Sequence, residues 1–296
     1  MSFIGEAILK GLVNTVGRNR PPHAGSPPAH TFDEYYQWQF DSSKRLFPFY
    51  PGFDPQGKTV LEIGCGTGGR TAYVASCGAS RVVGIDINVP EIELAKAITA
   101  RLKPELKNIE FIATKADEPP NLGQFDYVLI IDAMEHLVSP PDILKFAHSM
   151  TKPGGACYAS CIGWYHMNGS HTGILPWVNV LFSDETLLNH IRWKVTQPEY
   201  RPNRFDSDPP IERWRGLYSL HHRPGEYLNK ITISTFRKAA RYSIFEDSSV
   251  TVVPMGASRK NSGLAGLAAR VLARLPVCEE LFHSMIVGQF RRRPAK

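Results

Sequence analysis

The sequence predicts an α/β fold in which a mostly parallel sheet carries helices on both faces. From residue 58 onward, short apolar runs alternate with amphipathic stretches, as they do in successive β-α-β units. The first apolar run passes directly into the glycine-rich stretch VLEIGCGTGGRT at residues 60–71. A strand that ends in such a turn before a helix presents free backbone N–H groups to a ligand. The fold and a ligand site are therefore predicted by the same segment.

Two helices are predicted ahead of the sheet. The first spans 3–16, where four apolar residues recur at helical spacing, namely Ile4, Ile8, Leu12 and Val16. Four prolines between positions 21 and 28 indicate a stiff linker. The second helix is expected over 32–46, with an apolar stripe of Phe32, Tyr35, Tyr36 and Phe40. The sequence leaves open whether these helices close over the cofactor, although Tyr36 and Trp38 are placed to do so.

Five strands are predicted in the core of the sheet, at 59–64, 81–86, 109–113, 125–131 and 156–161. Helices are expected between them at 69–76, 90–102 and 141–150. The last of these helices is followed by Lys152-Pro153-Gly154-Gly155, in which a cation, a proline and two glycines form a stop signal.

The regular pattern fails between residues 162 and 230. This interval holds four of the five tryptophans, and an aromatic insertion of that length predicts a second small core, a substrate pocket or both. Helices at 234–243 and 264–275 and strands at 249–253 and 284–290 are expected after it. The predicted domains are N-terminal helices and linker (1–57), a cofactor-binding core (58–161), a substrate-recognition insertion (162–230) and a segment that completes the sheet with a basic tail (231–296).

Composition narrows the class of protein. No run of about 18 apolar residues and no signal-peptide pattern is present, so we expect a cytoplasmic location. The five cysteines form no Cys-x-x-Cys pair, which favours reduced and mostly buried thiols. Residues 256–296 hold eight Lys/Arg against two Glu and so carry the whole net charge of +6. Such an end is either a solvated surface or a contact for phosphate, nucleic acid or an anionic membrane.

The glycine turn carries more information than its spacing alone. Gly64-x-Gly66-x-x-Gly69 is a pattern that any dinucleotide fold can show. However, the acid Glu62 precedes the first glycine by two residues, where a dinucleotide-binding turn usually has an apolar residue. Asp86 also ends the second predicted strand, where a carboxylate can accept both hydroxyls of a ribose.

With Glu62-x-Gly64-x-Gly66-x-Gly68 as a first motif, the chain resembles the class I S-adenosylmethionine (SAM)-dependent methyltransferases. The likeness continues through VGID at 83–86, FDYVL at 125–129, Glu135-His136 and KPGG at 152–155. It covers about 58–161. The resemblance implies a Rossmann-like seven-stranded sheet, mostly parallel with the last strand antiparallel, and SAM as the cofactor.

The resemblance also implies which residues bind SAM. Gly64, Gly66 and Gly68 would let the backbone lie against the methionine part, while Glu62 orders the turn or meets the amino group. Asp86 would hold the ribose. The remaining expected contacts are Cys65, Ile87, Asp132 and, after the third strand, Ala116 and Asp117, although Lys115 stands where relatives have an acid.

The residues after strands four and five are candidates for the chemistry. Methyl transfer from a sulfonium depends on alignment of the acceptor, and a deprotonating group matters most for an alcohol. Asp132, Glu135 and His136 would share one face if they began a helical turn. With His171, they suit Mg or another divalent metal, which lowers the pKa of a bound hydroxyl.

This set looks like the metal site of small-RNA 3′-end 2′-O-methyltransferases and like the Glu-His turn of ubiquinone-pathway O-methyltransferases. In those families the metal coordinates two neighbouring hydroxyls of the acceptor. The alternative is that Glu135-His136 only shapes the cofactor pocket. In that case His136, His166 or His171 is the expected general base, with His221 and His222 as further candidates.

The sequence therefore predicts an O-methyltransferase of a small hydroxylated metabolite with a sugar, natural-product or phenolic scaffold. The acceptor would meet an aromatic wall of Trp164, Tyr165, Trp177, Trp193, Trp214 and Tyr218. We expect no nucleic acid partner, because the insertion is nearly balanced in charge. An RNA or lipid-linked glycan methyltransferase, peripheral membrane contact through the basic C-terminal segment, and a cofactor-binding protein without activity remain open alternatives.

Overall fold

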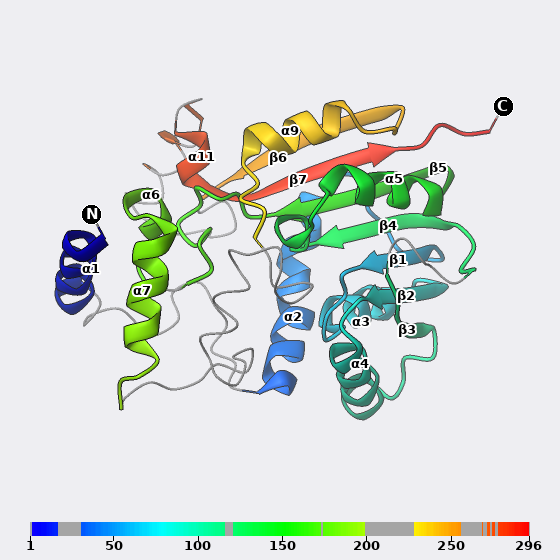
Figure 1. The fold of residues 1–296 in the computed structure, drawn as a ribbon. Helices are drawn as coiled ribbons and strands as arrows, with labels where there is room; N and C mark the ends of the chain where they lie inside the picture. The colour runs from blue at the N-terminus through cyan, green and yellow to red at the C-terminus, as the bar shows by residue number, and fades with distance from the viewer. Residues whose placement is uncertain are drawn as a thin grey trace.

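Seven strands form one sheet in the order β3-β2-β1-β4-β5-β7-β6 (Figure 1). The computed structural model describes residues 2–16, 31–115, 121–172, 174–198, 228–255 and 278–295, together with 268, 271, 272, 274 and 275. The strands are β1 (Thr59–Ile63), β2 (Arg81–Asp86), β3 (Ile109–Ala113), β4 (Phe125–Ile131), β5 (Thr151–Cys161), β6 (Asp247–Pro254) and β7 (His283–Arg291). β1 to β5 pair in parallel, and β7 runs antiparallel to both β5 and β6. The expected sheet, with its last strand antiparallel, is confirmed.

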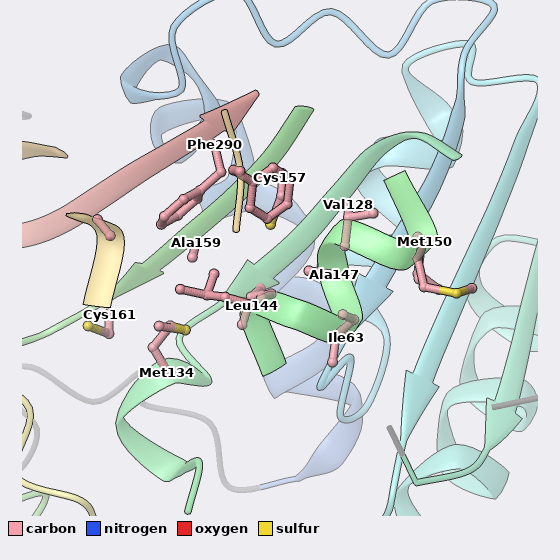
Figure 2. Packing of buried hydrophobic residues seen from close by; sticks show 14 of the residues in the cluster. Ile63, Val128, Met134, Leu144, Ala147, Met150, Cys157, Ala159, Cys161 and Phe290 are labelled. Carbon is pink, nitrogen blue, oxygen red and sulfur yellow. The ribbon is translucent and has the colours of Figure 1, made fainter. Parts of the chain in front are cut away.

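Helices cover both faces of the sheet, because successive side chains of each strand point to opposite sides. In β4, Val128 and Ile130 belong to one core cluster, whereas Leu129 and Ile131 belong to another. The first cluster includes residues of α5 (Pro140–Met150) and α9 (Ile233–Arg241). Figure 2 shows Val128 beside Leu144 and Ala147 of α5. The second cluster includes residues of α3 (Gly69–Ser76) and of the 3-10 turn η2 (Phe47–Phe49).

Three further helices complete the part of the fold that positions the site. α4 (Val89–Leu102) packs on β2 and β3. Its N-cap is Asn88, whose side chain accepts a hydrogen bond from the Glu91 N–H. α2 (Phe32–Leu46) begins with a capping box between Thr31 and Glu34 and packs against α3. The 3-10 turn η3 (Met134–His136) directly follows β4.

A smaller core lies at the far end of the molecule from β3 (Figure 1). There α1 (Ser2–Val16) packs on α7 (Asp184–Lys194), next to the short helix α6 (Val178–Leu181). Its buried members include Leu9, Trp164 and Leu187. The remaining short helix is α11 (Glu279–Phe282), which leads into β7.

Two details differ from the sequence-based expectation. In α1 the buried residue is Leu9, whereas Ile4 and Ile8 are exposed, so the predicted stripe is wrong. Leu9 and the partly buried Val13 pack in one cluster with residues of α7, so the buried face of α1 is shifted by one residue from the predicted stripe. The predicted linker at 21–28 lies outside the described residues, as does most of the predicted helix at 264–275.

The second difference is the start of β5, which begins at Thr151 and therefore contains Lys152-Pro153-Gly154-Gly155. The pairing with β4 jumps from Phe125↔Thr151 to Tyr127↔Ala156, so the stop signal forms a bulge within the strand. The bulge needs glycine at 155, because a Cβ there would lie 2.7 Å from the Asp126 carbonyl oxygen.

Two findings bear on the compositional expectations. Cys65, Cys157 and Cys161 are buried as free thiols, and Cys77 and Cys278 are partly buried and free. Within the described part of the chain, no helix is long and apolar enough to cross a membrane.

Candidate active site

The turn after β1 is built from glycines in a backbone conformation that other residues rarely adopt. Gly64, Gly66 and Gly68 have φ angles of 75°, 52° and 80°. A Cβ on Gly64 would lie 3.0 Å from the Ala133 side chain, and one on Gly66 would lie 3.0 Å from a carboxylate oxygen of Glu91. The turn therefore passes close to the end of β4 and to α4, and its backbone is left open.

A cavity lies over this turn, at the carboxyl ends of β1, β2 and β4. It lies where open α/β sheets bind their ligands. Eight of the predicted site residues line it, namely Glu62, Gly64, Cys65, Gly66, Asp86, Ile87, Asp132 and His136.

Asp86 ties the end of β2 to the glycine turn. One carboxylate oxygen accepts the Gly66 N–H at 2.9 Å, and the other accepts the Asn88 N–H at 2.9 Å. Burial raises the pKa of Asp86, and these two amide bonds oppose the rise. The carboxylate still borders the cavity, so its predicted contact with ribose hydroxyls fits its position.

Glu62 is a buried acid beneath the same turn. Its side chain is 2% exposed and accepts the Thr71 hydroxyl at 2.5 Å. Burial raises the pKa of Glu62 to about 7, while the Thr71 bond and the nearby Arg70 charge act in the opposite direction. Because Glu62 both bonds to α3 and lines the cavity, it fits either of its predicted roles.

Two predicted residues have structural positions instead. Gly68 is absent from the described lining of the cavity; it precedes α3, and a Cβ there would lie 2.5 Å from the Phe111 ring. His166 is buried in the loop after β5, where its Nδ1 accepts the Asn168 N–H at 3.1 Å. Burial and the neighbouring His283 lower the pKa of His166 to about 3, so it is a poor base at neutral pH. The prediction for His166 as a base is corrected accordingly, whereas that for Gly68 as a cofactor contact stays a prediction.

Asp132 pairs with an arginine. Its Oδ2 lies 2.5 Å from Nη2 of Arg70, a residue of the first turn of α3. Asp132 also has a φ of 50°, and its N–H donates to the Ser160 carbonyl. The helical turn that would have placed Asp132 on one face with Glu135 and His136 does not form, because η3 begins only at Met134.

Glu135, His136 and His171 come together without Asp132. Each offers one ligand atom, and these atoms all lie within 4.8 Å of one another. The two imidazole rings are 5.1 Å apart between centroids. Glu135 is 5% exposed, and its Oε2 is buried with no hydrogen-bond partner. A carboxylate oxygen in that state, facing two imidazoles, fits a divalent cation.

Sequence reasoning missed several residues that line the cavity, among them Tyr35, Gln39, Arg70 and Glu91. Arg70 carried a usable signal, because a cation in the first turn of a helix is unfavourable unless it has an anionic partner. Tyr35 and Gln39 lie one turn apart on α2 and reach the cavity, whereas Tyr36 is fully buried under that helix. Trp38 stacks on Tyr35 with 5.8 Å between ring centroids.

The expected aromatic wall is not part of this cavity in the described residues. Trp164 packs in the smaller core, and Trp177 donates to the Leu281 carbonyl. Trp193 lies under the Lys10 ammonium, 4.7 Å from the ring centroid. Several other predicted residues lie outside the described part of the chain, namely Ala116, Asp117, Trp214, Tyr218, His221 and His222.

Comparison with known families decides the class of this protein. The profile of a family described as "Methyltransferase domain" matches residues 32–197, which is more than half of the chain. The chain belongs to this methyltransferase family. The cavity fits SAM, the cofactor that the sequence motifs imply, because Gly64 and Gly66 leave its floor open and four carboxylates border it.

Curated relatives of this methyltransferase include O-methyltransferases. It is 35% identical over 107 residues to the ubiquinone biosynthesis O-methyltransferase of Pseudomonas paraeruginosa. This match covers 36% of this chain and 45% of that protein. It is 33% identical over 108 residues to the protein of the same name from Acinetobacter baylyi, with 36% and 44% covered. Each match spans less than half the length of the relative.

Among solved structures, a putative S-adenosylmethionine-dependent methyltransferase from Listeria monocytogenes is similar. The identity is 17%, with 88% of this chain and 99% of that chain covered and a TM-score of 0.48. A second one, from Mesorhizobium loti, is also 17% identical, with 87% and 98% covered and a TM-score of 0.47.

Proposed function

We propose that this methyltransferase transfers the methyl group of SAM to a hydroxyl oxygen of a phenolic ring that carries a second hydroxyl beside the first. The observation that carries the proposal is the group of Glu135, His136 and His171, which reaches the cofactor cavity through His136. The relatives named ubiquinone biosynthesis O-methyltransferase support an oxygen acceptor on a ring of the ubiquinone type.

The reaction needs a group that removes a proton. The acceptor oxygen forms a bond to the methyl carbon, the carbon–sulfur bond breaks, and the hydroxyl proton must leave. A phenol has a pKa near 10, as the tyrosine side chain does, so it is mostly protonated at neutral pH. An imidazole at the cavity wall, as in His136, can accept that proton.

The alternative to an imidazole base is assistance by a divalent metal that the same residues bind. Glu135, His136 and His171 would hold it, because their ligand atoms converge and one buried carboxylate oxygen has no partner. A bound divalent cation supplies Lewis acidity, which lowers the pKa of a coordinated hydroxyl. Two neighbouring hydroxyls suit such a site, since they offer two oxygen ligands in one plane.

The lining of the cavity favours a ring over a sugar. Leu137 and Ile143, which are apolar, line the cavity together with His136. Apolar side chains pack on the face of an aromatic ring and leave sugar hydroxyls without partners. Of the scaffolds that the sequence left open, the phenolic one therefore has the better support.

Acceptor specificity can be measured with labelled cofactor. We would incubate the purified protein with methyl-labelled SAM and each of three rings: one with two adjacent hydroxyls, its isomer with separated hydroxyls, and the corresponding diamine. The expected rate on the ring with adjacent hydroxyls is at least about tenfold higher than the rate on either other ring. The reason is that a site built around polar groups discriminates against ligands that leave those groups unpaired. Equal rates on the diamine would overturn the oxygen acceptor.

The role of the three-residue group is tested by substitution. His171→Asn and Glu135→Gln should each lower kcat by about 10²- to 10⁴-fold and leave the SAM dissociation constant nearly unchanged. His148→Asn is the control, because His148 lies on α5 near Glu246 and outside the described cavity lining. Full activity in the chelated protein and in both variants would refute the role of this group.

A further inference from the structure

Arg70 has an unusual place in the cavity. Four carboxylates line the cavity, namely Glu62, Asp86, Glu91 and Asp132. Among the described lining residues, Arg70 is the only lysine or arginine. An anionic group on a ligand in this cavity would be repelled by these four carboxylates and attracted by Arg70.

The guanidinium of Arg70 is buried and only partly used. Its side chain is 9% exposed, and Nη2 bonds to Asp132. Its Nε is buried without a hydrogen-bond partner. A guanidinium presents N–H donors as a fork that matches a carboxylate, so Arg70 retains donor capacity beyond its present bond.

The neighbours of Arg70 match the amino-acid part of the cofactor. That part carries an ammonium and a carboxylate on one carbon, so its binding site needs an anion and a cation side by side. Thr71, the residue after Arg70, is hydrogen-bonded to Glu62 at 2.5 Å. Glu62 and Arg70, the one lysine or arginine in the described lining, therefore meet at the first turn of α3.

We propose that Arg70 binds the α-carboxylate of SAM. Asp132 then acts as a positioning residue, because its side chain reaches Arg70 from the end of β4 through a backbone with φ of 50°. A non-glycine residue in this conformation is uncommon and is often retained at functional sites. The inference uses the cofactor of the family and is independent of the methyl acceptor proposed above.

The test compares ligands that differ in the carboxylate. Isothermal titration would give dissociation constants for S-adenosylhomocysteine, for decarboxylated SAM and for 5′-methylthioadenosine, which lacks the whole amino-acid part. In the unaltered protein, S-adenosylhomocysteine should bind at least about tenfold tighter than either other ligand, because a hydrogen bond to a charged group is worth that much.

Substitution of Arg70 should remove this preference. Arg70→Met should weaken S-adenosylhomocysteine by about 10- to 100-fold and change the two ligands without a carboxylate less than about threefold. Arg70→Lys should recover part of the loss, since lysine keeps the charge and lacks the fork. Arg81→Met is the matched control, because Arg81 lies at the start of β2, outside the described lining.

The outcomes separate binding from a structural role. If Arg70→Met weakens all three ligands equally, Arg70 only holds the cavity in shape and the proposal is wrong. If it leaves S-adenosylhomocysteine unchanged, the carboxylate lies elsewhere. Should both Arg70 variants fail to fold, equal affinities of the unaltered protein for all three ligands would still overturn the assignment.

Discussion

Replacing Glu62 with glutamine should stabilise the cofactor-free protein at alkaline pH and have little effect at acid pH. Glu62 is buried at 2% exposure, and its Oε2 accepts the Thr71 hydroxyl. Glutamine has the same shape and can accept the same bond through its amide oxygen. The substitution therefore changes the charge of a buried group and leaves its hydrogen bond in place.

The magnitude follows from the pKa. Burial raises the pKa of Glu62 from 4.5 to about 7, so between these values the folded protein holds a proton that the unfolded chain has released. Stability then falls as pH rises through this window, by about 1.4 kcal/mol per pH unit, and stays level above it. The glutamine variant avoids this loss. Its advantage should be near zero at pH 4.5 and reach about 3 kcal/mol at pH 8.

The assay is urea unfolding of both proteins at intervals between pH 4.5 and pH 8.5, without cofactor. Glu185→Gln, at an exposed position of α7, controls for the amide itself. With saturating SAM the advantage should shrink, because the ammonium of the cofactor favours an ionised Glu62. A difference between variant and unaltered protein that is the same at pH 4.5 and pH 8 would refute the reasoning.

Two further predictions concern stability. Gly68→Ala should lower the free energy of unfolding by about 3 kcal/mol, because its Cβ would lie 2.5 Å from the Phe111 ring at a φ of 80°. Gly123→Ala, with a φ of 76° and open space, should lose only about 1 kcal/mol in the same urea titration; equal losses would contradict the steric argument. Partial burial is outweighed at Asp126 by bonds from Thr59 and the Lys152 ammonium, which lower its pKa to about 2. Asp126→Asn should therefore lose roughly 1 kcal/mol at pH 7, allowing for partial exposure, and this difference should disappear as pH falls from 3.8 to 2; a difference that persists at pH 2 would exclude the charge as its cause.

The sheet and the floor of the cavity were predictable because their signals are local. The strands at 81–86 and 125–131 were predicted with the bounds that the structure shows, since buried parallel strands read as short apolar runs. The glycine turn was readable because positive φ angles favour one residue type.

The contents of the site depend on contacts between distant residues, which no local pattern encodes. Arg70 and Asp132 are 62 positions apart, and their ion pair removes Asp132 from the predicted metal set. His166 and His171 lie in one loop and were equivalent in the sequence. The loop buries the first against His283 and brings the second to His136.

The place of β7 has a consequence for synthesis of the protein. β7 follows β5 and β6 in the chain, yet it lies between them in the sheet. It pairs with β6 on one side and, on the other, with the edge of β5 that faces away from β4. Until residues 283–291 leave the ribosome, β5 therefore presents an unpaired edge, which is a template for aggregation. The described residues that line the cavity all lie between 35 and 143. The residues of the donor pocket are thus made first, on a sheet whose open edge is closed only by a segment that follows all of them in the chain.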